Sequence, residues 1–215
     1  MSFAADDDLP VAGTVVVLRD GAEGIEALLL RRPARGSFAG AWVFPGGMVD
    51  PGDRIPGAEE CDDARRAAVR EAAEEVGLAL GALSPLSCWV PPVGIPKRVR
   101  TWFFLAADPG QEITVSPAEV AETRWLTPDR ALEAHGAGGL TLFPPTWRTL
   151  HELRGEESVA AVLAAPQTPV VHRTRNVHTE DGTIFHWDGD ELAGRPPGSR
   201  ERIVAEQLPW RFELS

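Results

Sequence analysis

A glycine pair followed by an acidic helix, both within residues 44–78, is the feature that most constrains how this chain can fold. In the segment REAAEEVGL (residues 70–78), a helical turn of about 100° per residue brings Glu71, Glu74 and Glu75 to one side. Carboxylates at this spacing repel one another by roughly a few tenths of a kcal/mol per pair, and the negative end of the helix dipole adds to the cost. A hard divalent cation removes this repulsion, because Mg²⁺ and Mn²⁺ bind carboxylate oxygens, water and phosphate oxygens. The segment therefore predicts a metal site, although most acidic helix faces are simply solvated.

Local signals define the start, the end and the inner face of this helix. Asp62 or Asp63 is a suitable N-cap, and the Ala and Val side chains between positions 64 and 76 form a small apolar face that can pack on a sheet. Gly77 stands where a helix ends in a left-handed residue, and the leucine after it supplies a hydrophobic contact. Upstream, the Pro-Gly-Gly turn at residues 45–47 lets the backbone approach a ligand closely, because two residues lack Cβ. A glycine turn beside three acids predicts a metal–diphosphate site.

The same stretch resembles the Nudix box, G-x5-E-x7-R-E-U-x-E-E-x-G-U with U an aliphatic residue, of hydrolases that cut nucleoside diphosphates linked to another moiety. Its second half agrees nearly letter for letter at Arg70, Glu71, Glu74, Glu75, Gly77 and Leu78, with the small Ala72 at the first U. In the first half, counting back from Arg70 through x7 reaches Asp62, a shorter acid than the expected Glu. Gly47 lies 15 positions before Asp62 where the pattern has 6, so about nine residues are inserted between them. The turn-rich segment 48–61 is therefore expected to form a surface loop that leaves the helix intact.

The resemblance implies a divalent cation, Mg²⁺ or Mn²⁺, and assigns roles to the residues around it. The metal-binding groups that it implies are Glu71, Glu74, Glu75 and a backbone carbonyl of Gly46 or Gly47. Arg70 is expected to hold one of these catalytic carboxylates in place. A further carboxylate outside the box often serves as ligand or base in this family; Glu119 and Glu122 are the candidates, and Glu122 is slightly preferred.

Residues outside the box are similar to the peroxisomal coenzyme A diphosphatase branch of the Nudix family and its bacterial relatives. The similar segments are residues 28–33, 40–47, 100–105, 118–126 and 142–146. In the stricter coenzyme A lead-in, L-L-T-x-R-[SA]-x3-R-x3-G-x3-F-P-G-G, Arg31 and Gly40 fit, whereas Gly36 replaces the second arginine beside Arg35. The implied contacts to a diphosphate or a 3′-phosphate are the backbone of Gly46 and Gly47 and two basic clusters, Arg31, Arg32 and Arg35, and Lys97, Arg98 and Arg100.

Four functions remain open on these grounds. The first is a metal-dependent hydrolase that cleaves coenzyme A or an acyl derivative into 3′,5′-ADP and phosphopantetheine. The second is a broader hydrolase of ADP-ribose, dinucleotides or oxidised nucleotides, and the third is a catalytically silent nucleotide sensor, which the presence of all three acids disfavours. The fourth, an acidic structural or interaction protein with a chance acidic helix, is the least consistent with the glycine turn.

The composition limits the classes of partner that the chain is expected to bind and the cellular compartment expected for it. A net charge of −11 over 215 residues argues against nucleic acid, because binding its backbone needs a basic face. No apolar run is long enough to cross a membrane, the N-terminus is acidic, and two cysteines give no disulfide framework. We therefore expect a cytoplasmic protein without a membrane partner, whose ligand is a small nucleotide diphosphate; a homodimer stays open.

The succession of strand and helix patterns predicts an α/β protein, a mixed β-sheet sandwiched between helices, which the resemblance makes a Nudix fold. Strand patterns occupy residues 14–18, 25–30, 41–44, 88–90, 101–105 and 123–126, and helices are expected at 128–135, 146–153 and 158–165. Residues 1–10 are expected to form a disordered tail, 11–155 the hydrolase domain, and 156–215 an extension packed on the same domain, with short strands near 170–175 and 183–187. The aromatic residues expected mostly in the core are Trp42, Trp89, Trp102 and Phe104, and the histidines expected to form no metal site are His172, His178 and His186.

Overall fold

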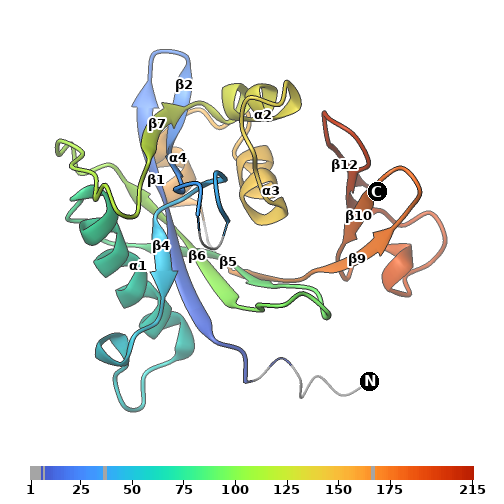
Figure 1. Ribbon diagram of the computed structural model, residues 1–215, viewed down its shortest axis with the longest axis horizontal. Helices are drawn as coiled ribbons and strands as arrows, with labels where there is room; N and C mark the ends of the chain where they lie inside the picture. The colour runs from blue at the N-terminus through green and yellow to red at the C-terminus, as the bar shows by residue number, and fades with distance from the viewer. Residues whose placement is uncertain (1–5, 7, 36–37, 166–167) are drawn as a thin grey trace.

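The computed structural model describes residues 6, 8–35, 38–165 and 168–215, which form two β-sheets with helices on both sides of the larger one (Figure 1). The larger sheet has eight strands in the order β3-β2-β1-β6-β5-β8, with β4 paired to β1 and β7 paired to β2. Its strands are β1 (Val11–Gly21), β2 (Gly24–Arg31), β3 (Trp42–Val43), β4 (Gly46–Met48), β5 (Ser84–Val90), β6 (Arg100–Ala107), β7 (Glu122–Leu126) and β8 (Val170–Arg173). The β1–β6 and β5–β8 pairs are parallel and the other pairs are antiparallel, so the sheet is mixed, as predicted. Most of the predicted tail, residues 1–5 and 7, lies outside the described residues, as does Gly36 of the lead-in.

The alternation of side chains along β1 separates two hydrophobic cores. Val15 and Val17 belong to the core beneath α1 (Glu60–Val76), while Val16 and Leu18 belong to the core on the opposite face. That second core lies beneath α2 (Pro128–Gly136), α3 (Pro144–Glu152) and α4 (Val159–Ala164). All four β1 side chains are 0% exposed, because both faces of the strand are covered. The helix–sheet–helix layering confirms the predicted α/β class (Figure 1).

Small residues let α1 pack closely on β1. A Cβ atom added at Gly13 would lie 1.8 Å from the carbonyl oxygen of Ala64, so only glycine fits there. The helix ends as predicted, since Gly77 has a φ of 71° and its N–H donates to carbonyls of the last turn. The predicted N-cap is wrong, because the helix begins before Asp62 and Asp63 and both lie inside its first turn.

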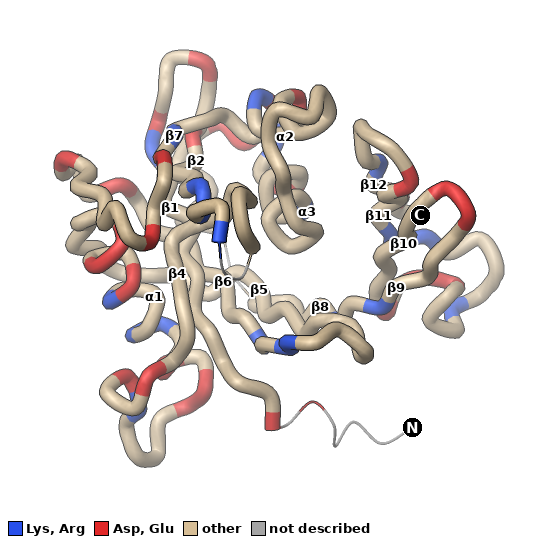
Figure 2. The backbone as a smooth tube through the Cα atoms, viewed as in Figure 1, with Lys and Arg blue, Asp and Glu red and all other residues tan. Residues whose placement is uncertain are grey.

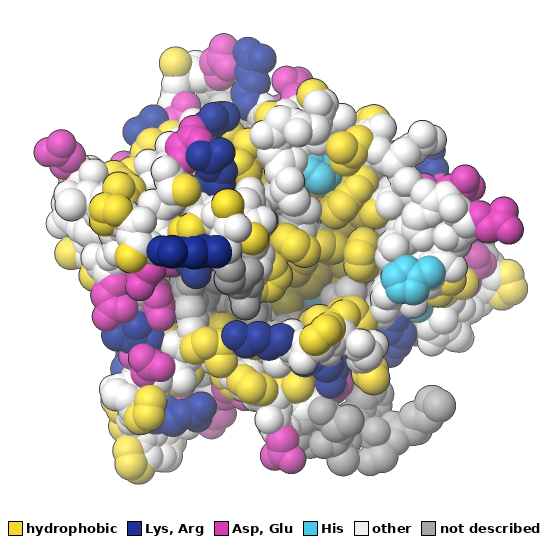
Figure 3. Space-filling view, in the orientation of Figure 1, with side chains coloured by type: hydrophobic (Ala, Val, Ile, Leu, Met, Phe, Trp, Pro, Cys, Tyr) yellow, Lys and Arg dark blue, Asp and Glu magenta, His cyan; other side chains and the backbone are white. Residues whose placement is uncertain are grey.

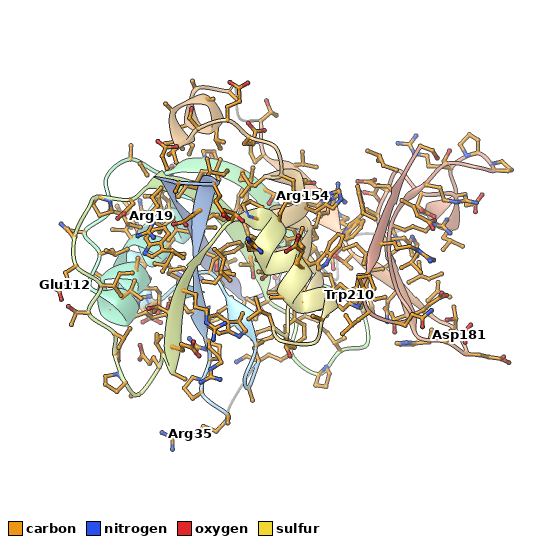
Figure 4. All side chains as sticks on the ribbon, turned by 90° about the horizontal axis from the view of Figure 1, so that it is seen from above. Arg19, Arg35, Glu112, Arg154, Asp181 and Trp210 are labelled. Carbon is orange, nitrogen blue, oxygen red and sulfur yellow. The ribbon has the colours of Figure 1, made fainter. Side chains whose placement is uncertain are left out.

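The C-terminal region forms a second, antiparallel sheet. Its strands are β9 (Arg175–His178), β10 (Thr183–His186), β11 (Glu201–Ala205) and β12 (Arg211–Leu214), with the 3-10 turn η2 (Glu191–Ala193) before β11. The strand predicted at 170–175 is divided, because its first part joins the larger sheet as β8. Trp187 and Ile203 of this region share a hydrophobic core with Trp147 of α3. Trp210 lies between α3 and the smaller sheet (Figure 4), where it contacts the rings of His135, Trp147 and Phe185.

The surface differs between the two sides of the larger sheet. Acidic residues gather on α1 and on the loop that precedes it (Figure 2). Figure 3 shows a hollow, lined by hydrophobic side chains, between α3, the smaller sheet and the loop that joins β5 to β6. No helix in the described part of the chain is both long and apolar enough to cross a bilayer.

Candidate active site

Glu75, in the last turn of α1, is 1% exposed and lies against the glycine turn. The Gly46 N–H donates to its Oε2 at 2.9 Å, and Arg32 Nη1 donates to its Oε1 at 2.6 Å. Burial raises the pKa of Glu75 to about 7 against the opposing effects of Gly46 and Arg32. The neighbouring acids Glu71 and Glu119 add to the increase. The site thus holds a buried carboxylate whose negative charge is only partly compensated.

Glu71 packs directly over the second glycine of the turn. A Cβ atom at Gly47 would lie 2.2 Å from Glu71 Oε1, so any larger residue there would displace the Glu71 carboxylate. Arg70 Nη1 donates to the same oxygen at 2.9 Å. Burial raises the pKa of Glu71 and outweighs the lowering by Arg70, and nearby Glu74 and Glu119 raise it further. Two acids of α1 therefore face the backbone of the glycine turn.

Arg70 ties these acids to the loop that follows the turn. Its Nη1 donates to Glu74 Oε2 as well as to Glu71, each at 2.9 Å, and its Nη2 donates to the Met48 carbonyl at 3.0 Å. Glu74 is the most exposed of the three box acids, with 54% of its side chain accessible. One guanidinium therefore orients two of the acids that the sequence assigns to the metal.

Asp53 is a site residue that the sequence analysis missed. It is 5% exposed, and Arg70 donates to both of its carboxylate oxygens, through Nε at 3.2 Å and Nη2 at 3.0 Å. The Asp50 N–H donates to Asp53 Oδ2 at 2.9 Å. Burial would raise the pKa of Asp53, but Arg70 and the Asp50 amide together lower it. Asp53 therefore stays ionised and fixes the guanidinium from the side opposite the box acids.

The position of Asp53 corrects the predicted insertion. Counting forward from Gly47 through x5, rather than back from Arg70, reaches Asp53, so the glycine half of the box is intact. The extra residues lie between Asp53 and Arg70, in the loop 54–59 and the first turns of α1. Asp62 instead pairs with Arg65 on the same helix and makes no contact with Arg70 among the described bonds. A count made from both ends of the motif would have found this.

Of the two candidate acids outside the box, the geometry favours Glu119. Glu122 lies on β7, where Arg124 Nε donates to it at 2.7 Å and Arg31 Nη2 lies 3.4 Å away. Glu119 is exposed, and its charge raises the pKa of both Glu71 and Glu75. Its loop is tied to the end of α1, because the Ser116 N–H donates to the Glu75 carbonyl at 2.9 Å. These observations favour Glu119, and the choice between Glu119 and Glu122 stays a prediction.

Of the three arginines before the glycine turn, one contacts the site, one pairs with an acid on the sheet and one faces solvent. Arg32 bonds to Glu75, and Arg31 pairs with Glu122 across β2 and β7. Arg35 is exposed, and Figure 4 shows it pointing away from the body of the protein. Only Arg35 of this cluster is thus left open to a phosphate.

The second basic cluster lies at the other end of α1. Arg100 donates to Glu60 at 3.0 Å, and Arg98 donates to the Pro91 carbonyl at 2.9 Å. Lys97 is exposed on the loop between β5 and β6. Since Glu60 precedes Glu71 by eleven residues, it lies about 16 Å away along the helix axis. The structure therefore does not bring the Lys97–Arg100 cluster together with the box acids.

The aromatic and histidine side chains singled out from the sequence are mostly packed away from this site. Those exposed by 5% or less are Trp42, Trp89, Phe104, His172 and His186. Trp102 is partly buried, with its Nε1 donating to Glu60 at 2.8 Å, and His178 contacts Asn176 and Thr183 on the smaller sheet. None of them faces the glycine turn through a described contact.

The donor set of the box fits a hard divalent cation. Within the described residues no three Asp, Glu, His or Cys side chains are already arranged as a metal site, because the box acids turn towards Arg32 and Arg70. All side-chain donors at the turn are carboxylate oxygens, the type that Mg²⁺ and Mn²⁺ prefer. The raised pKa values of Glu71 and Glu75 indicate negative charge that a cation would stabilise. The residues that would hold it are Glu71, Glu74, Glu75 and the backbone of Gly47.

A known family model and several solved structures resemble this chain. The NUDIX domain model matches residues 9–144. A NUDIX hydrolase from Alicyclobacillus acidocaldarius has a TM-score of 0.67 and 24% identity, covering 74% of this chain and 97% of that one. A MutT NUDIX hydrolase from Burkholderia pseudomallei has a TM-score of 0.53 and 25% identity, covering 68% of this chain and 99% of that one. The NUDIX domain of Shewanella oneidensis NrtR, solved with ADP ribose, has a TM-score of 0.54 and 16% identity, covering 72% of this chain and 92% of that one.

Proposed function

Since this chain belongs to the NUDIX family and is a hydrolase of diphosphate bonds, we propose that its substrate is coenzyme A or an acyl-coenzyme A. The observation that carries the reaction is the contact of buried Glu75 and partly buried Glu71 with the Gly46-Gly47 turn. This contact supports a site in which carboxylates and close backbone groups face one diphosphate. The choice of coenzyme A is supported by the lead-in, where Arg31 and Gly40 stand at the spacing of coenzyme A diphosphatases.

Each residue of the site has a separate role in the proposed reaction. A bound Mg²⁺ or Mn²⁺ would neutralise charge on the diphosphate oxygens. Water attacks one phosphorus, the bridging P–O bond breaks, and the leaving phosphate takes the electron pair. Glu119, near both Glu71 and Glu75, accepts the proton of the attacking water, while Arg70 holds Glu71 and Glu74 in place. From coenzyme A the products are 3′,5′-ADP and phosphopantetheine.

Arg35 is the residue that we assign to the 3′-phosphate. Arg31 and Arg32 already pair with Glu122 and Glu75, whereas Arg35 pairs with no acid among the described residues. A guanidinium is well suited to a phosphate monoester, because it presents two parallel N–H donors. The arginine lies in the lead-in itself, next to the position where the coenzyme A pattern has its second arginine.

A product-resolved survey tests the substrate. Coenzyme A, acetyl-coenzyme A, ADP-ribose, NADH and diadenosine polyphosphates are offered with Mg²⁺ and then with Mn²⁺, and the products are separated by chromatography. We expect 3′,5′-ADP to be released and coenzyme A to be cleaved with the highest kcat/KM. A clear preference for ADP-ribose or a dinucleotide would reject coenzyme A as the substrate. If none of the offered compounds is cleaved, a nucleotide-binding sensor becomes the better description of the protein.

Dephospho-coenzyme A provides the matched control for the 3′-phosphate. We expect Arg35→Ala to raise KM for coenzyme A about tenfold, roughly the 1.4 kcal/mol of one charged hydrogen bond, and to leave KM for dephospho-coenzyme A unchanged. Equal rates for the two substrates in the unmodified enzyme would remove the 3′-phosphate argument.

The two acids outside the box provide a second matched pair. We expect Glu119→Gln to lower kcat about a hundredfold and to remove the acidic limb of the pH–rate profile, as loss of a general base does. Glu122→Gln, which alters only the pair with Arg31 and Arg124, should stay within about twofold of the unmodified enzyme. The reverse ranking would restore Glu122 as the base.

A further inference from the structure

Two phenylalanines are paired on the surface beside the lead-in. The ring centroids of Phe38 and Phe143 lie 4.9 Å apart with an interplanar angle of 80°. Phe38 is 57% exposed and Phe143 is 39% exposed, so the contact leaves much of both rings open. Of the aromatic residues expected from the sequence to lie mostly in the core, Trp42, Trp89 and Phe104 are at most 3% exposed, and the partly buried Trp102 donates to Glu60 near the start of α1. The pair is therefore the aromatic surface that this side of the sheet offers to a ligand.

The backbone at Phe38 indicates that this exposure is held in place. Its φ is 59°, in the left-handed region, and it is the one non-glycine residue of the described chain with positive φ. For a residue with a Cβ this conformation is disfavoured, because Cβ approaches the following carbonyl oxygen. A bulky side chain that is strained and yet not buried gains little folding energy in return, and such strain is concentrated at ligand-binding sites.

Backbone hydrogen bonds connect the segments that carry both rings to the active site. The Ala41 N–H donates to the Phe38 carbonyl at 3.0 Å, and the Arg32 N–H donates to the Ala41 carbonyl at 2.9 Å. Arg32 is the residue whose side chain bonds to Glu75 at 2.6 Å. On the other side, the Trp42 N–H donates to the Thr141 carbonyl at 2.9 Å, which holds the segment of Phe143 against β3. The two rings are thus carried by segments that bond to the adjacent residues Ala41 and Trp42, at the strand that leads to the glycine turn.

The distance along the chain keeps the pair within reach of the same ligand. Phe38 precedes Gly46 by eight residues, and the two segments meet through Arg32, whose N–H bonds to Ala41 and whose side chain bonds to Glu75, the acceptor of the Gly46 N–H. A nucleotide whose phosphates lie at the glycine turn can therefore direct its base towards the turn that contains Phe38.

We propose that Phe38 and Phe143 form the platform on which the adenine of the substrate stacks. The proposal rests on the proposed function, since it names the base end of the same ligand. A T-shaped pair presents one ring face with a second ring edge beside it, a surface that suits a flat heteroaromatic ring. Phenylalanine offers no hydrogen bond, so the platform recognises the planar ring and leaves the phosphates to Arg35 and the glycine turn. Base–aromatic stacking tolerates any base, because every base has a π-face, and its loss is expected to raise KM.

The test compares ring-retaining and ring-removing variants on substrates with and without a base. Phe38→Ala, Phe38→Leu and Phe38→Tyr are assayed with Phe143→Ala and with the control Val177→Ala, which alters a residue 39% exposed on the smaller sheet. The substrates are coenzyme A and its abasic analogue, in which hydrogen replaces adenine. We expect Phe38→Ala and Phe38→Leu to raise KM for coenzyme A about tenfold, with kcat and the KM of the abasic analogue unchanged. Phe38→Tyr and Val177→Ala should match the unmodified enzyme.

Other outcomes would overturn the platform. If Phe38→Leu behaves like Phe38→Tyr, or if both substrates are affected equally, the rings do not stack on the base. If the variants change only the sedimentation mass, the pair is a contact between two copies of the chain.

A binding experiment separates this failure from failure of the proposed function. The 5′-monophosphate of 2-aminopurine riboside loses fluorescence when its base stacks, and it needs no hydrolysis. Quenching by the unmodified protein and not by Phe38→Ala supports the platform even if coenzyme A is not cleaved. Equal quenching by both proteins rejects the platform even if coenzyme A is cleaved.

Discussion

Two buried carboxylates of this protein, Glu75 and Asp190, each pair with an arginine, and their pKa values move in opposite directions. Asp190 is 0% exposed and receives two N–H groups from Arg202, one of them at 2.7 Å. The backbone N–H groups of Leu192 and Glu201 each donate to it at 2.9 Å. Burial alone would raise the pKa of Asp190, but these four bonds lower it to about 2.

Glu75 is 1% exposed, lies deeper among protein atoms than Asp190, and is supplied with half as many donors. It accepts one N–H from Arg32 and one from Gly46, and it faces the further acids Glu71 and Glu119. Burial raises its pKa to about 7, since the donors do not compensate for the lost water. The difference teaches what each region is built for: the Asp190 pair stabilises the turn before β11, whereas Glu75 retains negative charge that a cation can use.

Glu75→Gln removes that charge while it keeps the shape of the side chain, and it should have the largest effect. We expect hydrolysis to fall about a thousandfold, or roughly 4 kcal/mol in activation free energy, because a metal-binding oxygen is lost. In EDTA at pH 8 the free energy of unfolding should rise by up to about 3 kcal/mol. The sign follows because a folded-state pKa above the ordinary 4.5 makes the ionised form costly as the pH rises through 7. Steady-state kinetics and urea unfolding measure the two effects, and joint loss of activity and stability would show that the charge supports the fold.

Asp190→Asn should act on stability alone. It leaves Arg202 buried without its ionised partner, so we expect the free energy of unfolding to fall by about 3 kcal/mol. In the unmodified protein this pair contributes above about pH 4, and the contribution is lost as the pH falls towards 2, because the folded-state pKa lies below the ordinary 3.8. Urea unfolding measures the change, and the kcat/KM of the folded protein should stay within about twofold. A hundredfold loss of activity would contradict the division between the two regions.

Asp53→Asn and Asp62→Asn form a matched pair that tests the box as corrected by the structure. Asp53→Asn weakens the hold on Arg70, so we expect kcat/KM to fall about 10- to 100-fold, as for other residues that orient metal ligands. Asp62→Asn, which alters only the pair with Arg65, should change kcat/KM by less than about twofold. Kinetics at saturating Mn²⁺ make the comparison, and equal losses would return Asp62 to the site.

The smallest effect concerns His172, a buried base in the C-terminal region. Burial lowers its pKa from 6.5 to about 3, with Arg148 adding to the shift, so the folded protein keeps it neutral. Below pH 6.5 His172 binds a proton in the unfolded chain but not in the folded chain. The free energy of unfolding therefore falls by about 1.4 kcal/mol for each unit by which the pH is lowered. Unfolding in the Glu75→Gln background between pH 7 and 5 measures the summed slope of His172 and of His135, His151 and His186, whose pKa values burial also lowers. His172→Phe should reduce this slope, while the exposed His178→Phe should not. An unchanged slope in His172→Phe would assign it to another group.

The sequence predicted the parts of the fold that depend on local pattern. The acidic helix, its glycine end and the alternating strands around β1 and β2 follow from periodicity and from Gly77, which the structure confirms. The strands β11 and β12 were missed, because short runs between prolines become strands only when they pair with each other and with β10.

Two features of the candidate site depend on contacts that only the structure shows. A count forward from Gly47 reaches Asp53 in the sequence, but only the structure shows that it bonds to Arg70, 17 positions further along the chain. Glu119 lies on an irregular loop, and the bond from Ser116 to the end of α1 is what brings that loop to the acids. Spacing alone ranked Glu122 above it, although β7 gives that residue two arginine partners.

The bond between Asp53 and Arg70 also closes the base of the inserted loop, so the length of that loop need not affect the active site beside it. A loop closed at its base transmits little of what happens at its tip, so its length can vary while the acids keep their positions. At that tip, a Cβ atom on Gly57 would meet nothing within 4 Å, although its φ of 82° favours glycine, so an addition belongs beside Gly57 rather than in its place. The enzyme thus carries an attachment point for a foreign peptide or a fluorophore, a few residues from its active site in sequence and insulated from it by one ion pair.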